Sequence, residues 1–310
     1  MTVFLDKNIY APAGEYLAEH AEVVTDFEHP ERLDAIICRA RPITRELIEQ
    51  CPKLKVIARH GVGVDSVDVK CATQHRIAVI NAPTSNADSV AELVVALFLM
   101  LSRMLYEANV KSREGSFEKK APANFRGLEM NGKVFGQIGM GNIAQRVARI
   151  MHNGFGCKVL GYDPFISAED AAARGFEKVD SIEQLLEMSD YVNVNVPLIP
   201  GTKNMLGREV MAHFKQGTIF VNAARGGVAD EDALYDCMVS GQLRGAACDT
   251  FADGEPVSPD HKLLILRNFS ATPHLGGNTE ETLQKTGMQI MKDTLAYLNG
   301  EGGYHQVNKF

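Results

Sequence analysis

A glycine-rich turn at residues 139–144 has the residue types that would bind a dinucleotide. It reads GMGNIA and lies between an apolar stretch typical of a buried strand, 132–139, and a stretch with helical spacing of apolar residues, 142–151. Gly139 would allow the tight turn, and Gly141, which has no Cβ, would let the backbone approach a pyrophosphate at the helix N-terminus. The alternative is an ordinary strand–helix turn in another kind of α/β protein.

Asp163 strengthens the dinucleotide interpretation. It ends the next predicted strand, 157–163, and follows Gly139 by about 24 residues, close to the roughly 20 that this fingerprint has. Its carboxylate would accept hydrogen bonds from the adenosine ribose hydroxyls and would repel a 2′-phosphate. The pattern therefore predicts NAD rather than NADP.

Three later residues have the chemistry of a site that interconverts a hydroxyl and a carbonyl. Arg225, Glu255 and His274 each lie at or just past the end of a predicted strand, where ligands bind in parallel sheets. Such a site needs a cation for a substrate carboxylate, a group that titrates near neutrality and a partner that tunes it. Taken singly, each of the three could equally be a surface or loop residue.

The turn GVGVD at 61–65 is a fourth candidate. Gly61 and Gly63 permit a nest of backbone N–H groups, which would bind an anion such as a carboxylate without a side chain. Arg59 and His60 directly precede the turn and would raise the local positive potential. An ordinary turn between a strand and a helix would have the same composition.

The apolar pattern alternates between strand and helix, which predicts an α/β fold with parallel sheets covered by helices on both faces. A long helix at 88–111 is either a connector between domains or one core helix, and the last helix is predicted at 280–298. If the last helix packs back on the first lobe, the chain crosses twice and a cleft lies between two lobes. The predicted strands are 2–6, 21–24, 34–38, 54–58, 78–81, 132–139, 157–163, 191–197, 218–224, 245–250 and 269–274.

Composition excludes several classes of protein. The 310 residues are 45% hydrophobic and 23% charged, and the net charge of −7 argues against nucleic-acid or anionic-membrane partners. The most apolar stretch, 93–101, is far shorter than the roughly 20 residues that span a bilayer, and the N-terminus lacks a signal-peptide pattern. The six cysteines form no CxxC pair, which favours core thiols in a reducing cytoplasm. Without HExxH or HxH spacing, we expect no metal site.

In ordered motifs over nearly its whole length, the chain resembles the NAD-dependent D-isomer-specific 2-hydroxyacid dehydrogenases. Within that family it is most similar to the D-3-phosphoglycerate dehydrogenases, with no C-terminal regulatory domain expected because the chain ends at Phe310. The motifs are RHGVGVDSVDV (59–69), NAPTSNADSVAEL (81–93), GKVFGQIGMGNIA (132–144), GYDPF (161–165), VNVPLIPGTKNML (194–206), NAARGGVADEDAL (222–234) and ATPHLGG (271–277).

The resemblance implies two Rossmann-like lobes. A discontinuous substrate-binding domain would comprise 1–97 plus 282–310, and an inserted NAD-binding domain would comprise 98–281. The helix at 88–111 lies where the family dimerises, so a homodimer is expected, although the same helix could be a connector within a monomer.

Residue roles follow from the same resemblance. Arg225 would hold the substrate carboxylate and carbonyl, His274 would be the acid/base and Glu255 its partner. Backbone N–H groups of Val62 and Gly63 would bind the carboxylate. The substrate would also be contacted by Arg59, His60, Arg225 and His274. NAD would be bound by Gly139, Gly141, Asn142, Ile143, Asp163, Pro197, Thr202, Ala223, Arg225, Asp249 and His274, with Asp249 on the nicotinamide carboxamide.

The chain departs from the family pattern in four places, one of which, Ala144 in place of the third glycine of the fingerprint, the motif tolerates. Glu255 follows Asp249 by one residue more than is usual, so either the loop bulges or Asp253 competes for the role. Asn195 stands where many members have His or Ser, which would alter the adenine pocket. His60 stands where the phosphoglycerate enzymes have a small residue, which would alter substrate choice.

The substrate is left open at this stage. Besides 3-phosphoglycerate, the alternatives are glyoxylate or hydroxypyruvate, D-lactate, malate and sulfolactate. Arg39, Arg59 and His60 indicate a second anionic group on the substrate, unless they are simply solvated. A formate-type enzyme is disfavoured because that branch has Gln in place of Glu255. A different class, an NAD-sensing corepressor-like binding protein, would keep the same site residues, and the absence of a disordered tail argues against it.

Overall fold

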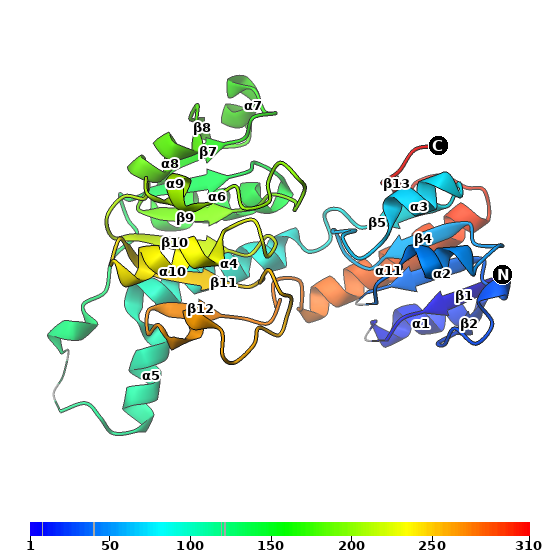
Figure 1. Cartoon of the computed structure of the whole chain (residues 1–310), viewed down its shortest axis with the longest axis horizontal. Helices are drawn as coiled ribbons and strands as arrows, with labels where there is room; N and C mark the ends of the chain where they lie inside the picture. Colours follow the sequence, from blue (N-terminus) through cyan, green and yellow to red (C-terminus); the bar gives the residue numbers. More distant parts are fainter. Residues whose placement is uncertain (8, 40, 119, 121) are drawn as a thin grey trace. The chain divides into compact units, whose positions relative to one another are not determined.

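The computed structural model describes residues 1–7, 9–39, 41–118, 120 and 122–310. The chain forms two compact units (Figure 1). Unit 1 comprises Met1–Asn86 together with Gly277–Phe310, and unit 2 comprises Ala87–Gly276. The predicted α/β class, with two lobes that are each built on a parallel sheet and with one lobe discontinuous in sequence, is confirmed.

The sheet of unit 1 has the strand order β13-β5-β4-β3-β1-β2 within the described residues, and all its pairs are parallel except β13 with β5. The two faces follow from the alternation of side chains along each strand. One face packs on α1 and α11 and the other on α2 and α3. The strands are β1 (Thr2–Leu5), β2 (Glu22–Val24), β3 (Ala35–Cys38), β4 (Val56–Arg59), β5 (Ala78–Asn81) and β13 (His305–Gln306).

The last helix packs back on unit 1, as the sequence suggested. α11 contributes Ile290, Met291 and Leu295 to the core that also contains strands β3, β4 and β5. The helices of unit 1 are α1 (Ala11–Ala18), α2 (Arg45–Glu49), α3 (Val69–Gln74) and α11 (Glu280–Leu298), with a short 3-10 turn η1 (Pro30–Arg32).

In unit 2 the described strands are all parallel, in the order β12-β11-β10-β9-β6-β7-β8. The order reverses between β6 and β9, so the point where a doubly wound sheet binds its ligand lies beyond the carboxyl ends of these two strands. The strands are β6 (Val134–Ile138), β7 (Lys158–Tyr162), β8 (Glu177–Lys178), β9 (Tyr191–Val194), β10 (Thr218–Asn222), β11 (Leu243–Cys248) and β12 (Phe269–Ala271).

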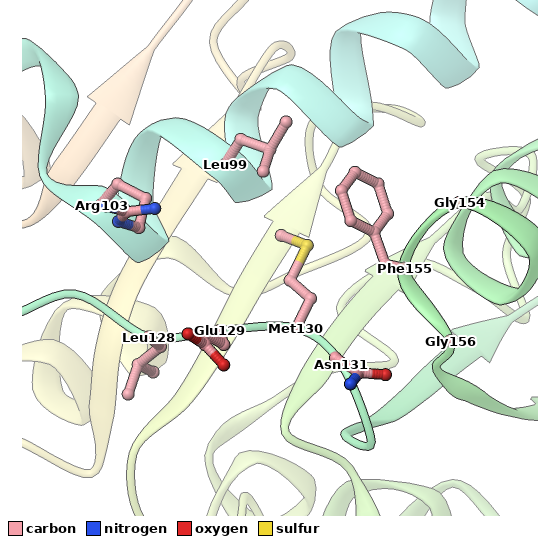
Figure 2. Close-up of a pocket in the computed structure, with 9 residues that line it drawn as sticks. All are labelled: Leu99, Arg103, Leu128, Glu129, Met130, Asn131, Gly154, Phe155 and Gly156. Atoms are coloured by element: carbon pink, nitrogen blue, oxygen red, sulfur yellow. The ribbon is translucent and has the colours of Figure 1, made fainter.

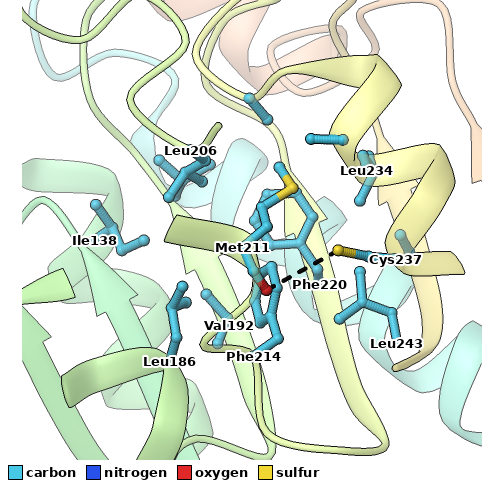
Figure 3. Close-up of a cluster of buried hydrophobic side chains, with 14 of the residues drawn as sticks. Ile138, Leu186, Val192, Leu206, Met211, Phe214, Phe220, Leu234, Cys237 and Leu243 are labelled. Atoms are coloured by element: carbon cyan, nitrogen blue, oxygen red, sulfur yellow. Dashed lines mark hydrogen bonds between the residues drawn. The ribbon is translucent and has the colours of Figure 1, made fainter. Parts of the chain in front are cut away.

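Helices cover both faces of this second sheet. α4 and α6 pack on one face, and α8, α9 and α10 pack on the other around Leu206 and Phe220 (Figure 3). All six cysteines are buried and free of disulfides, as predicted. The helices are α4 (Ala87–Arg103), α5 (Leu105–Arg113), α6 (Asn142–Phe155), α7 (Ala168–Ala173), α8 (Ile182–Met188), α9 (Arg208–Met211) and α10 (Glu231–Val239), with 3-10 turns η2 (Ala123–Phe125) and η3 (Lys262–Ile265).

The helix predicted at 88–111 is in fact two helices. Met104 has a left-handed backbone (φ 51°) and separates α4 from α5, which diverge by 63°. At the break the backbone N–H of Leu128 donates to the carbonyl of Ser102 at 2.9 Å, so a distant segment takes an acceptor that a continuing helix would use. Among the described residues no single helix is long and apolar enough to cross a membrane, and the bent pair α4 and α5 passes that test only when the two are joined.

Candidate active site

The turn after β6 has the form that the fingerprint requires. Gly139 has φ 81°, and a Cβ there would lie 2.5 Å from the carbonyl oxygen of Asn195, so the turn admits no side chain. A Cβ on Gly141 would meet no atom of the chain within 4 Å. The protein's own packing therefore does not demand glycine at 141, whereas close approach of a pyrophosphate would. Gly141 is the N-cap of α6 and offers no capping side chain, which leaves the first N–H groups of that helix for a ligand.

Asp163 lies directly beside this turn. Its Oδ2 accepts a hydrogen bond from the backbone N–H of Met140 at 3.1 Å, and its Oδ1 accepts one from Phe165 at 3.0 Å. The carboxylate is therefore held at the end of β7, and each oxygen keeps capacity for a further donor such as a ribose hydroxyl.

The remaining predicted cofactor residues lie along the same edge of the sheet. Asn142 and Ile143 open α6. The hydroxyl of Thr202 donates to the carbonyl of Pro197 at 2.6 Å and accepts from the N–H of Ile199 at 2.9 Å, which closes the loop after β9. Ala223 follows β10 directly.

His274 and Glu255 form a hydrogen-bonded pair. His274 Nδ1 lies 3.1 Å from Glu255 Oε2, and the backbone N–H of Phe251 donates to Glu255 Oε1 at 2.7 Å. The His274 side chain is 48% exposed and that of Glu255 is 19% exposed, so the imidazole can meet a ligand while the carboxylate behind it is shielded. The longer loop is thus accommodated without a change of partner, because Glu255 and not the exposed Asp253 contacts His274.

The ionisation of Glu255 reflects these contacts. Burial alone would raise its pKa, but the hydrogen bonds from His274 and Phe251 and the charges of His274 and Arg225 bring the pKa below its ordinary value. Glu255 is therefore ionised at neutral pH and can stabilise a positive imidazolium.

Asp249 anchors the segment that carries His274. Its Oδ1 accepts from the Thr272 hydroxyl at 2.6 Å and the Leu275 N–H at 2.7 Å, and its Oδ2 accepts from the Gly276 N–H at 2.9 Å. This anchoring holds His274 in a left-handed backbone conformation, with φ 58°, which is strained for any residue with a Cβ. The sequence did not reveal this anchoring role.

Arg225 is the third predicted catalytic residue, beside His274 and Glu255. It follows β10, and its carbonyl accepts from Asn222 Nδ2 at 3.1 Å. Because β10, β11 and β12 are neighbours in the sheet, the segments after them bring Arg225, Glu255 and His274 to one edge. The arrangement places a cation, an acid/base and a carboxylate together, which is what interconversion of a hydroxyl and a carbonyl requires.

The candidate residues of unit 1 lie at the carboxyl end of β4. Arg59 donates to the carbonyl of His60 at 2.6 Å, and Asn81 Nδ2 donates to the carbonyl of Val62 at 2.6 Å, which orders the turn containing Gly63. His60 is only 6% exposed. Burial, together with the charges of Arg39 and Arg59, lowers its pKa to about 4. His60 is therefore uncharged at neutral pH and adds no positive charge here.

Comparison with known proteins decides the family. Residues 95–276 match the family model described as the D-isomer specific 2-hydroxyacid dehydrogenase, NAD binding domain. The chain belongs to this family. It is 39% identical over 281 residues to hydroxypyruvate reductase of Thermotoga maritima, covering 90% of this chain and 89% of that protein.

Other relatives are named for other substrates. The chain is 41% identical over 276 residues to D-3-phosphoglycerate dehydrogenase of Methanocaldococcus jannaschii, covering 89% of this chain but 52% of that protein. It therefore spans about half the length of the phosphoglycerate dehydrogenases that it matches. A solved D-lactate dehydrogenase of Aquifex aeolicus, complexed with NAD and lactic acid, is 26% identical, with a TM-score of 0.85 and coverage of 97% of this chain and 96% of that one.

A polar cluster lies under the dinucleotide turn of this family member, and sequence reasoning had noted only Asn195 in it. Gln137 on β6 and Asn193 on β9 are fully buried, and Asn193 Nδ2 donates to Gln137 Oε1 at 2.9 Å. Asn195 Oδ1 accepts from Gln137 Nε2 at 3.3 Å and also from Asn193. The sequence signal that could have revealed this cluster is the presence of polar residues in β6 and β9, the two adjacent strands between which the strand order reverses.

A pocket of about 430 Å³ lies elsewhere in the NAD-binding unit (Figure 2). Met130 and Asn131 line it just before β6 begins, and Phe155 and Gly156 line it where α6 ends. It therefore lies at the amino edge of the sheet, opposite to the dinucleotide turn, and we assign it no part in the chemistry.

One group of donor side chains among the described residues could share a metal ion. Ligand atoms of Glu49, Cys71 and His75 lie within 4.8 Å of one another. Glu49 and His75 are exposed, and exposed acidic groups often gather without an ion. We therefore assign no metal to this group.

Proposed function

We propose that the protein is an NAD-dependent D-2-hydroxyacid dehydrogenase that converts a D-2-hydroxy acid and NAD⁺ into the 2-oxo acid, NADH and a proton. The observation that carries this proposal is the 3.1 Å pair of His274 Nδ1 and Glu255 Oε2. The pair lies with Arg225 at the carboxyl edge of the family's NAD-binding domain.

The residues would divide the work as follows. Because Nδ1 of His274 faces Glu255, its Nε2 is left to take the hydroxyl proton during oxidation and to return it during reduction. Glu255 stabilises the imidazolium that forms. Arg225 orients the substrate carboxylate and polarises the carbonyl. When bound, NAD supplies the hydride acceptor at C4 of its nicotinamide ring.

The cofactor would lie along the carboxyl edge of unit 2. Gly139, Gly141 and the first N–H groups of α6, from Asn142 and Ile143, would hold the pyrophosphate. Asp163 would bind the ribose hydroxyls. Pro197 and Thr202 would flank the adenine, while Ala223, Arg225, Asp249 and His274 would line the nicotinamide end.

We further propose that the substrate carries a second anionic group, as 3-phosphoglycerate does. In unit 1, which we take as the substrate-binding domain, Val62 and Gly63 would bind the carboxylate through backbone N–H groups. Arg39 and Arg59 would bind the second anion, and His60 would contribute shape but no charge because its pKa is about 4. Hydroxypyruvate is a second candidate, because the T. maritima hydroxypyruvate reductase matches over 90% of the chain.

The test is NADH oxidation by the purified protein with phosphohydroxypyruvate, hydroxypyruvate, glyoxylate, pyruvate, oxaloacetate and sulfopyruvate. We expect the highest kcat/KM with a substrate that has a second anion, and an Arg39→Gln variant should lose that preference while keeping activity on hydroxypyruvate. Turnover of none of the six with NADH binding intact would overturn the enzymatic proposal in favour of an NAD-sensing binding protein.

We also propose a cytoplasmic homodimer that binds neither nucleic acid nor membrane. Most apolar residues of α4 are buried in the core of unit 2, whereas Ala96 is exposed and Leu93, Leu99, Met100 and Leu101 are only partly buried. α5 has no buried residue and exposes Leu105 (52%) and Tyr106 (69%). A Tyr106→Glu variant should shift the protein from dimer to monomer in light scattering, and a wild-type monomer would contradict the proposal.

A further inference from the structure

The loop that carries Glu255 is tied to helix α10 by a pair of side chains that the proposed mechanism does not use. Glu231 is the first residue of α10, and His261 immediately precedes η3. His261 Nε2 lies 3.0 Å from Glu231 Oε2, and Glu231 Oε1 accepts a hydrogen bond from the backbone N–H of Ala252 at 2.7 Å. Each of the two carboxylate oxygens is therefore engaged by a donor from the segment between β11 and β12.

The ring of His261 is fixed in place and in tautomer. The backbone N–H of Leu263 points at its Nδ1 at 3.4 Å, which makes Nδ1 an acceptor and assigns the proton to Nε2, facing Glu231. The ring also contacts Phe251 edge-on, with centroids 5.6 Å apart and planes at 70°. The same loop is thus held both by hydrogen bonds to Glu231 and by the aromatic contact between His261 and Phe251.

The Phe251–Ala252 segment that this pair holds also contacts both sides of the candidate active site. The N–H of Phe251 donates to Glu255 Oε1 at 2.7 Å. A Cβ placed on Gly226, the residue after Arg225, would lie 1.9 Å from the carbonyl oxygen of Phe251. The backbone next to Arg225 therefore lies directly on this segment, and a displacement of the segment would move Glu255 and disturb Arg225 together.

We propose that Glu231 and His261 are positioning residues of the hydride-transfer reaction, because they hold the Phe251–Ala252 segment that aims Glu255 at His274. The inference rests on the proposed function. Arg225 is the charged group from a neighbouring segment that acts on the His274–Glu255 pair, and Asp232 and Lys262, which form an ion pair with each other, lie beside the Glu231–His261 pair. Beyond each other, Glu231 bonds to the N–H of Ala252, and His261 meets the N–H of Leu263 and the ring of Phe251. None of these three is a predicted substrate or cofactor residue, so the pair acts through Glu255.

The test compares Glu231→Ala and Glu231→Gln with the matched control Asp232→Asn, which removes an exposed carboxylate from the same first turn of α10. In Glu231→Ala we expect kcat for reduction to fall roughly 10- to 100-fold, since small displacements of a catalytic group cost up to about 10². The alkaline limb of its pH profile should move to lower pH, because the protonated imidazole has lost a well-aimed counter-charge. Glu231→Gln should be intermediate, since its one carbonyl oxygen can still accept from Ala252. Asp232→Asn should stay within about twofold, as expected for an exposed ion pair.

A structural readout separates this inference from the proposed function. Hydrogen exchange of residues 250–256 should accelerate in Glu231→Ala while the NADH dissociation constant stays within about twofold of wild type. Unchanged exchange, or a wild-type pH profile together with wild-type kcat, would overturn the positioning role. If the wild type reduces no 2-oxo acid, the proposed function fails, and the exchange result still decides whether the pair holds the loop. Should Glu231→Ala not fold, His261→Gln, which keeps a donor for Glu231 but loses the ring contact, is expected to show the same changes to a smaller degree.

Discussion

Replacing Glu255 by glutamine tests the acid/base pair most directly. The substitution keeps the shape and one acceptor oxygen but removes the negative charge that faces His274 at 3.1 Å. Two unit charges at that distance interact by about 1.3 kcal/mol in a water-like medium and by about 5 kcal/mol at an effective dielectric constant near 20. Because the His274 side chain is 48% exposed, solvent screens this interaction and its energy lies nearer the lower of the two values. We therefore expect the substitution to remove about 1.3–2.7 kcal/mol of stabilisation of the imidazolium, which corresponds to a roughly 10- to 100-fold lower rate.

The assay is the pH dependence of kcat for reduction with saturating NADH. The pKa of Glu255 is lowered below its ordinary acidic value, so Glu255 stays ionised from pH 6 to 9 and adds no limb of its own in that range. We expect Glu255→Gln to lose activity most at alkaline pH, where the imidazolium needs the counter-charge. Asp253→Asn is the control, because Asp253 is an exposed carboxylate of the same loop. A Glu255→Gln profile that superimposes on wild type, or an equal loss in Asp253→Asn, would refute the reasoning.

Three further predictions follow from the site and from unit 1. His274→Ala should retain NADH binding but lose about 10²–10⁴ in kcat, and a normal kcat would contradict its role. Asp163→Ser should raise kcat/KM for NADP relative to NAD by about tenfold, the value of roughly one charge-assisted hydrogen bond, and an unchanged ratio would exclude Asp163 as the selector. His60 has a pKa of about 4 in the folded protein against an ordinary value of 6.5, so the unfolded chain binds more protons between these values and stability falls as pH drops through that window. The loss is about 3 kcal/mol for full protonation. Urea unfolding at pH 7 and 4.5 should show a smaller drop for His60→Gln than for wild type, and an equal drop would refute the burial argument.

The fold followed closely from the sequence because its strands are short apolar runs and its helices have clear amphipathic spacing. What the pattern missed depends on tertiary contacts. The division of α4 from α5 at Met104 requires Leu128, more than twenty residues away, to take the carbonyl of Ser102. The strands β8 and β13 have two residues each, too few to show a period, and β13 also departs from the parallel pattern.

The residue types of the candidate site could be predicted from the sequence, but the hydrogen bonds and the burial of its side chains could not. Alignment of strand ends placed Arg225, Glu255 and His274 at one edge, as parallel strands require. The sequence could not decide between Glu255 and Asp253, since that depends on how the loop folds around the N–H of Phe251. It also suggested a positive His60, whereas burial keeps this side chain neutral.

The discontinuity of unit 1 has a consequence for synthesis on the ribosome. Residues 1–86 emerge first, but the face of their sheet that α11 covers waits for residues 277–310. At about 5–20 residues per second, the intervening chain takes roughly 10 to 40 s to make. During that interval unit 2 can fold. In residues 1–86, α1 is already available to cover this face, but the part on β4 and β5 that α11 contacts remains uncovered. A nascent chain stalled at residue 276 should therefore resist protease in unit 2 and be cleaved in residues 1–86, and equal protection of both would contradict this order. Of the two units, the one whose synthesis begins first is then the later to be completed.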